Sequence, residues 1–67
     1  MTDNVRYIHF PCPCCGERRL TAVGAYEICP VCDWEDDPAQ SQDPDLAGGA
    51  NAPSLNQARA QWAEKNA

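Results

Sequence analysis

The sequence has few of the side chains that build a hydrophobic core. Leu, Ile, Val and Phe together number nine of the 67 residues, and ten alanines and five cysteines make up much of the 43% hydrophobic content. Fewer than about 20% of these four residue types, combined with a high net charge, is typical of disordered chains, and the net charge here is −5. The length allows a single domain at most. Something besides apolar burial must therefore stabilise the fold.

Long apolar runs are also missing. A secretory signal peptide needs a basic start and about 7 to 15 apolar residues, and a membrane-spanning helix needs about 20; the sequence has neither pattern. We therefore expect a cytoplasmic protein with no membrane association, in a reducing compartment where disulfides rarely persist. The odd number of cysteines would also leave one thiol unpaired in a disulfide framework. These observations favour metal binding over disulfides.

Basic side chains are scarce. The chain has five Lys and Arg residues against ten Asp and Glu residues, whereas phosphate binding needs clustered Lys and Arg. A nucleic-acid-binding zinc ribbon is therefore disfavoured unless Arg6, Arg18 and Arg19 form a local patch. An acidic protein is instead attracted to a basic protein surface, because opposite potentials steer association. The composition favours a protein partner with a basic surface.

Four of the five cysteines form two C-x2-C pairs, separated by 13 residues. The predicted metal ligands are Cys12, Cys15, Cys29 and Cys32. A two-residue gap lets both sulfurs of a tight turn point into one cavity. The residue after each pair, Gly16 or Asp33, tolerates the left-handed backbone that such a turn needs. The spacing predicts a tetrahedral site of four thiolates, in which each pair forms a knuckle, the turn that carries two ligands.

Ligand type alone does not separate zinc from iron, because both ions bind four thiolates in tetrahedral geometry. Zinc is the commoner ion in closed structural sites, so Zn²⁺ is the expected cofactor. Residues 29–32 (CPVC) resemble the knuckle of rubredoxins, which keeps an iron electron carrier as the alternative. The same residues resemble a thioredoxin-type redox motif, but the acidic run that follows them forms no suitable helix face.

Cys14 lies between the two ligands of the first pair. A closed site takes four ligands, so we expect Cys14 to stay unligated. We interpret it as a small space-filling side chain beside the knuckle. The alternative is a reactive thiol that the adjacent metal site activates and that oxidises on exposure.

The remaining sequence predicts short strands, a loop and a helix within one domain, residues 1–67. Residues 5–10 predict a strand, and residues 20–23 and 25–28 predict a hairpin around Gly24. Residues 33–53 predict an irregular acidic loop. Ser54 and Gln57 form a capping box for a helix within residues 54–66. The fold class is therefore a small metal-stabilised α+β domain, zinc-ribbon-like over residues 5–32, with a C-terminal helix.

The predicted helix carries a narrow apolar stripe. Leu55, Ala58 and Trp62 follow one another at helical spacing. We expect this stripe to pack on a ribbon face that carries four aromatic residues, Tyr7, Phe10, Tyr26 and Trp34. The alternative is that the stripe docks a protein partner.

The closed site also bears on function. Catalytic zinc keeps an open position, with three protein ligands and a water, whereas four cysteines close the site. We therefore expect a non-catalytic interaction or regulatory module, such as an inhibitor or immunity-like protein. The candidate contact surface comprises Trp34, Glu35, Asp36 and Asp37, with Trp34 as an aromatic anchor. For any single one of these residues, packing beside the metal site or a solvated loop is the simpler interpretation.

Several motifs in a fixed order resemble the cysteine-rich CPCC family of short bacterial and phage-associated proteins. The motifs are residues 12–16 (CPCCG), 26–32 (YEICPVC), 34–37 (WEDD), 48–51 (GGAN) and 54–55 (SL). The likeness extends from about Pro11 to Trp62. It implies a metal-binding fold and carries no agreed biochemical activity.

Overall fold

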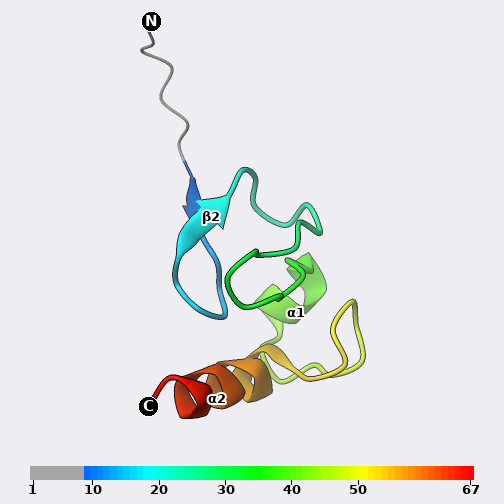
Figure 1. Cartoon of the computed structure of the whole chain (residues 1–67). Helices are drawn as coiled ribbons and strands as arrows, with labels where there is room; N and C mark the ends of the chain where they lie inside the picture. The colour runs from blue at the N-terminus through cyan, green and yellow to red at the C-terminus, as the bar shows by residue number, and fades with distance from the viewer. Residues whose placement is uncertain (1–8) are drawn as a thin grey trace, which may run out of the picture.

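The computed structural model describes residues 9–67 and contains two short strands and two helices (Figure 1). The elements are β1 (Phe10–Pro11), β2 (Arg18–Leu20), α1 (Pro38–Gln42) and α2 (Leu55–Lys65). This arrangement confirms the small α+β fold with a hairpin and a C-terminal helix. The strand predicted over residues 5–10 falls mostly outside the described part of the chain. Neither helix of this part is long and apolar enough to cross a membrane.

The hairpin surrounds the first knuckle. Strands β1 and β2 pair antiparallel, with Phe10 opposite Leu20 and an irregularity before Pro11. The connection between them is closed by the N–H of Cys12, which donates to the carbonyl of Glu17 at 2.8 Å. The hairpin therefore presents the first pair of cysteines from its own loop.

The hairpin predicted around Gly24 is wrong. Residues 21–25 form bends, and Ile28 bridges Glu35 instead of pairing with an earlier strand. The carboxylate of Glu27 accepts hydrogen bonds from the backbone N–H of Thr21 at 2.8 Å and from its hydroxyl at 3.0 Å. The Glu27 carboxylate thus occupies hydrogen-bond donors of Thr21 that a neighbouring strand would have paired with. The alternation of residue types could not predict this side-chain contact.

The second knuckle is built like the first. The N–H of Asp33 donates to the carbonyl of Cys29 at 2.8 Å, just as Gly16 donates to Cys12 at 2.8 Å. Both donors have the left-handed backbone that the sequence predicts, with φ of 67° at Asp33 and 83° at Gly16. The N–H of Cys29 also donates to the carbonyl of Trp34 at 2.9 Å, which closes the turn.

The segment over residues 33–53 is more ordered than an irregular loop. Helix α1 lies within it, and the side chain of Asp37 caps this helix by accepting from the N–H of Ala39 at 2.9 Å. Pro38 occupies the first helical position, where its fixed φ suits a helix and its missing N–H costs nothing. The prediction overlooked this Asp-Pro start signal because acidic composition dominated the interpretation.

A buried amide holds the rest of this segment in place. The side chain of Gln40 is 0% exposed. Its Nε2 donates to the carbonyls of Leu46 at 2.9 Å and Pro53 at 3.0 Å, and its Oε1 accepts from Nδ2 of Asn51 at 2.9 Å. Asn51 in turn donates to the carbonyl of Glu35 at 2.8 Å. Polar contacts therefore replace the apolar packing that the composition cannot supply.

Helix α2 begins as predicted. The hydroxyl of Ser54 accepts from the N–H of Gln57 at 3.1 Å, and the Gln57 side chain accepts from the N–H of Ser54 at 2.9 Å. These two bonds complete the capping box. They fix the start of the helix at Leu55, which places that side chain in the core.

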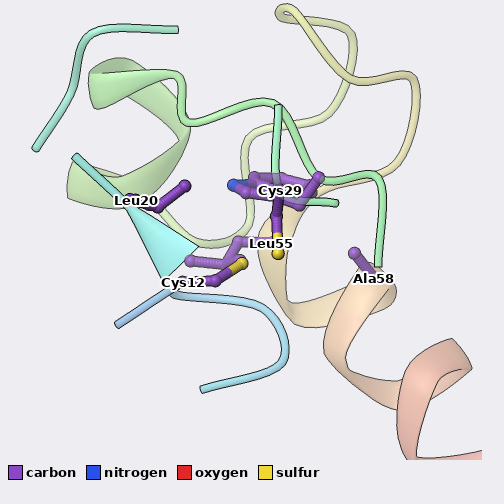
Figure 2. Close-up of a cluster of buried hydrophobic side chains, with 6 residues drawn as sticks. Cys12, Leu20, Cys29, Leu55 and Ala58 are labelled. Atoms are coloured by element: carbon purple, nitrogen blue, oxygen red, sulfur yellow. The ribbon is translucent and has the colours of Figure 1, made fainter. Parts of the chain in front are cut away.

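The core is small and includes two cysteines of the knuckles (Figure 2). Its buried apolar members are Cys12, Leu20, Cys29, Trp34, Leu55 and Ala58. The helix therefore packs on the knuckles through Leu55 and Ala58, as the stripe predicts, while Trp62 is only half-buried.

The aromatic part of the packing prediction is wrong for two residues. Phe10 is 36% exposed and Tyr26 is 54% exposed, so neither covers the helix. Tyr26 directly follows the bends over residues 21–25 and has a left-handed backbone with φ of 60°. Tyr7 lies outside the described residues. Trp34 is the aromatic side chain that joins the helix in the core.

Candidate metal centre

Four cysteine side chains meet between the two knuckles. The sulfur atoms of Cys12, Cys15, Cys29 and Cys32 all lie within 4.8 Å of one another. The Sγ atoms of Cys12 and Cys32 are 3.6 Å apart, and those of Cys15 and Cys29 are 3.8 Å apart. All five cysteines of the chain are free thiols. The structure thus brings together the four residues that the spacing selects.

The distances between the sulfur atoms fit tetrahedral coordination of one metal ion. Thiolates about 2.3 Å from a central zinc ion lie about 3.8 Å from one another at the corners of a tetrahedron. The two sulfur pairs given above, 3.6 Å and 3.8 Å apart, come from opposite knuckles. Each knuckle therefore contributes one sulfur to each of the two close sulfur pairs. The four-cysteine cluster indicates a metal site.

The cluster combines two buried and two half-buried ligands. Cys12 is 1% exposed and Cys29 is 0% exposed, because both belong to the core. Cys15 and Cys32 are half-buried and pack against that core. The metal site and the hydrophobic core are therefore one unit, so occupancy of the site and packing of the core depend on each other.

Burial disfavours thiolates in this cluster unless a cation is present. It raises the pKa of Cys12 to about 11 and also raises the pKa of Cys32. Burial acts in the same direction on Cys29, but backbone N–H groups of Cys32 and Val31 outweigh it and lower the pKa of Cys29. The Val31 N–H lies 3.4 Å from the Cys29 sulfur. A divalent cation supplies the positive charge that four adjacent thiolates need.

Cys14 does not belong to the cluster of four. Its side chain is half-buried and packs against the core beside the ligands. Burial raises the pKa of its thiol. Cys14 also lines a cavity of about 400 Å³, and Cys32 lines the same cavity.

Helix α2 is tied directly to the first knuckle. Nε of Arg59 donates to the carbonyl of Pro13 at 2.8 Å, across 46 residues of sequence. Among the described residues, this bond joins the helix to the turn that carries Cys12 and Cys15. Sequence reasoning treated Arg59 only as a charge, and no local pattern pointed to this long-range contact.

The structure buries three of the four residues of the predicted contact surface. Trp34, Asp36 and Asp37 are 3%, 3% and 5% exposed. The carboxylate of Asp36 accepts from the N–H of Gly24 at 2.7 Å, and Glu35 is half-buried. The carboxylates of Asp36 and Asp37 accept hydrogen bonds from backbone N–H groups of the fold. Burial of a carboxylate is tolerated here because each one gains charge-assisted hydrogen bonds.

Asp37 gives the fold a predicted sensitivity to acid. The N–H of Ala50, 2.9 Å away, holds the pKa of Asp37 below its ordinary value, and the N–H of Ala39 acts in the same direction. A carboxyl with a lower pKa in the folded state stabilises the fold above its unfolded pKa. This contribution disappears as the pH falls through the folded pKa. Stability that depends on Asp37 should therefore be present at neutral pH and lost in acid.

The comparison of wild type with Asp37→Asn tests this prediction. Urea unfolding followed by circular dichroism at several pH values gives the difference in unfolding free energy, which should shrink as the pH falls below the ordinary range for aspartate. Acid also protonates the cysteines, but it does so in both proteins and cancels in the difference. The exposed Asp43 supplies a control, and Asp43→Asn should change little. A pH-independent difference for Asp37→Asn would refute the assignment.

Comparison with protein-family models matches residues 10–67 to the family described as Cysteine-rich CPCC. The matched region contains both knuckles, α1 and α2. No curated protein matches the sequence. The comparison therefore identifies a family by its cysteine framework without naming an activity.

Proposed function

The chain belongs to the cysteine-rich CPCC family, and we propose that it is a non-catalytic protein in which one zinc ion is bound by the four clustered cysteines. The observation that carries this proposal is the set of four sulfurs within 4.8 Å of one another. Cys12, Cys15, Cys29 and Cys32 would hold the ion. Bound zinc would supply cross-linking and charge neutralisation, the roles typical of structural sites.

The donor set supports a structural rather than a catalytic role. Four thiolates fill the coordination sphere of tetrahedral zinc and leave no position for a water or a substrate. Two of the ligands, Cys12 and Cys29, are also buried in the core. An ion held in this way stabilises the arrangement of the two knuckles and of the helix that packs on them.

We further propose that the stabilised domain acts by binding a protein. The net charge of −5 supports a partner with a basic surface, because opposite potentials favour association. Within residues 9–67, the acidic side chains that remain exposed are Glu17, Asp33, Asp43, Asp45 and Glu64. Any such contact would use these residues, since the carboxylates of Asp36 and Asp37 are occupied within the fold. Binding through them should weaken as ionic strength rises.

An iron electron carrier is the alternative for the same four thiolates. Metal analysis and a visible spectrum of protein purified without added metal separate the two proposals. We expect one zinc ion per chain and a colourless protein. Stoichiometric iron with thiolate-to-iron charge-transfer absorption would support the electron carrier and refute the structural zinc site. A folded protein without either metal would refute both.

A further inference from the structure

One side chain of helix α2 contacts the turn that carries two of the metal ligands. Nε of Arg59 donates to the carbonyl of Pro13 at 2.8 Å, and Pro13 lies between Cys12 and Cys15. The guanidinium also has a contact within its own helix, because Nη1 of Arg59 donates to Oδ1 of Asn56 at 3.4 Å. These two bonds orient the Arg59 side chain toward the first knuckle.

The carbonyl that accepts from Arg59 belongs to the peptide group between Pro13 and Cys14. A trans peptide group is planar, so its C=O and its N–H point in opposite directions. A donor that fixes the carbonyl therefore also fixes the direction of the Cys14 N–H. Because this rigid unit lies inside the turn, holding its plane also restricts the turn that carries Cys12 and Cys15.

The second knuckle shows where such an N–H points. Both knuckles have the order Cys-Pro-x-Cys, and in both the same backbone bond closes the turn at 2.8 Å. In the second knuckle, the residue after the proline is Val31, and its N–H donates to Sγ of Cys29 at 3.4 Å. Cys14 occupies the matching position of the first knuckle, where the matching sulfur is that of Cys12. By this correspondence, the peptide that helix α2 holds directs its N–H toward a metal ligand.

We propose that Arg59 is a positioning residue of the metal centre, which raises metal affinity by holding the peptide between Pro13 and Cys14 in its metal-binding orientation. The inference rests on the proposed binding of zinc by the four cysteines, and it identifies a residue outside the ligand set that controls this binding. A turn that is ordered in advance loses less conformational entropy when its sulfurs bind a metal. Removal of hydrogen-bonding groups that support metal ligands typically lowers metal affinity by about 10- to 100-fold.

Two substitutions of Arg59 separate its hydrogen bond from its charge. Glutamine has a nitrogen donor, Nε2, the same number of bonds from the backbone as Nε of arginine, but it has no charge. Methionine has a methyl group at that position and therefore no donor. Arg59 is exposed, and arginine, glutamine and methionine have similar helix propensities. Arg59→Gln and Arg59→Met therefore form a matched pair that differs in the donor.

Zinc affinity and the visible spectrum of the cobalt-loaded full chain together test the inference. Chelator competition should give a zinc affinity about tenfold lower for Arg59→Met than for wild type, whereas Arg59→Gln should remain close to wild type. Co²⁺ bound by four sulfurs absorbs visible light, and the positions of its bands depend on the arrangement of those sulfurs. The bands should therefore shift in Arg59→Met and remain unchanged in Arg59→Gln.

Ser54→Ala controls for general stability, because metal binding and folding are coupled. This substitution removes the capping bond between Ser54 and Gln57, which belongs to α2 and reaches neither knuckle. It should lower the apparent zinc affinity without moving the cobalt bands.

Three results would overturn the inference. The first is wild-type zinc affinity in Arg59→Met. The second is an equal loss in Arg59→Gln, because the charge and not the donor would then determine the affinity. The third is weaker binding by Arg59→Met with unshifted cobalt bands, because Arg59 would then act through the stability of the fold, as Ser54 does. Wild type that binds no zinc contradicts the proposed function, whereas zinc-loaded wild type with any of these three results contradicts only the inference.

Discussion

Replacement of Cys12 or Cys29 by serine should unfold the protein, whereas Cys14→Ser should leave it folded. In the part of the chain that the structure describes, the large apolar side chains of the buried core are Leu20, Trp34 and Leu55. Burial of each such side chain contributes about 1.5 to 3 kcal/mol, which is small against the conformational entropy that folding costs. Zinc binding to a structural site contributes about 10 to 16 kcal/mol. Folding should therefore depend on the metal.

Serine at a ligand position does more than remove one bond to the metal, because it also buries a hydroxyl group. Cys12 and Cys29 are buried, so a hydroxyl placed there loses its contact with water and gains no strong bond to zinc. Cys14 is outside the cluster, and serine is close to it in size. The two kinds of variant therefore differ in metal ligation and not in the residue introduced.

Circular dichroism and tryptophan fluorescence during a chelator titration measure this dependence. Wild type should unfold as the chelator removes the metal and refold when zinc is returned. Cys12→Ser and Cys29→Ser should be unfolded at all metal concentrations near the wild-type requirement, while Cys14→Ser should follow the wild-type curve. An unfolded Cys14→Ser beside a folded Cys12→Ser would overturn the ligand assignment.

The knuckles were predictable because their determinants are local. Two sulfurs separated by two residues, followed by Gly16 or Asp33, specify a turn with a left-handed residue whatever surrounds it. The capping box at Ser54 and Gln57 is equally local. In contrast, the pairing partner of β2 depends on which of several short segments reaches it, and the carboxylate of Glu27 alters that competition. Residue periodicity contains no information about such a contact.

The acidic segment shows a second limit. Six acids without a basic residue between positions 33 and 45 resemble a solvated loop in composition. The structure instead uses Asp36 and Asp37 as acceptors for the N–H groups of Gly24 and Ala50. Whether a carboxylate is solvated or buried depends on backbone donors that arrive from elsewhere in the chain. Charge counting therefore located the segment correctly, but it did not predict that two of the six carboxylates are buried.

Gln40→Ala should destabilise the metal-loaded protein by about 3 kcal/mol, because the buried amide of Gln40 would be lost and the carbonyls of residues 46, 51 and 53 would lose their donor. The loop cannot easily close over the gap. A Cβ on Gly49 would lie 2.9 Å from Cδ of Gln40, so the backbone already touches this amide. The loss should appear in urea unfolding at saturating zinc, with metal content unchanged.

Two further variants isolate the role of the amide donor. Gln40→Glu keeps the shape of the side chain but turns an acceptor toward the same carbonyls, so it should destabilise the fold at least as much as Gln40→Ala. Gln42 lies in the same helix with an exposed side chain, and Gln42→Ala should change the unfolding free energy by less than about 0.5 kcal/mol. If Gln40→Glu were as stable as wild type, the buried amide would not be what orders residues 43–53. Apolar contacts would then have to stabilise a segment whose sequence contains one large aliphatic residue, Leu46, which is 39% exposed.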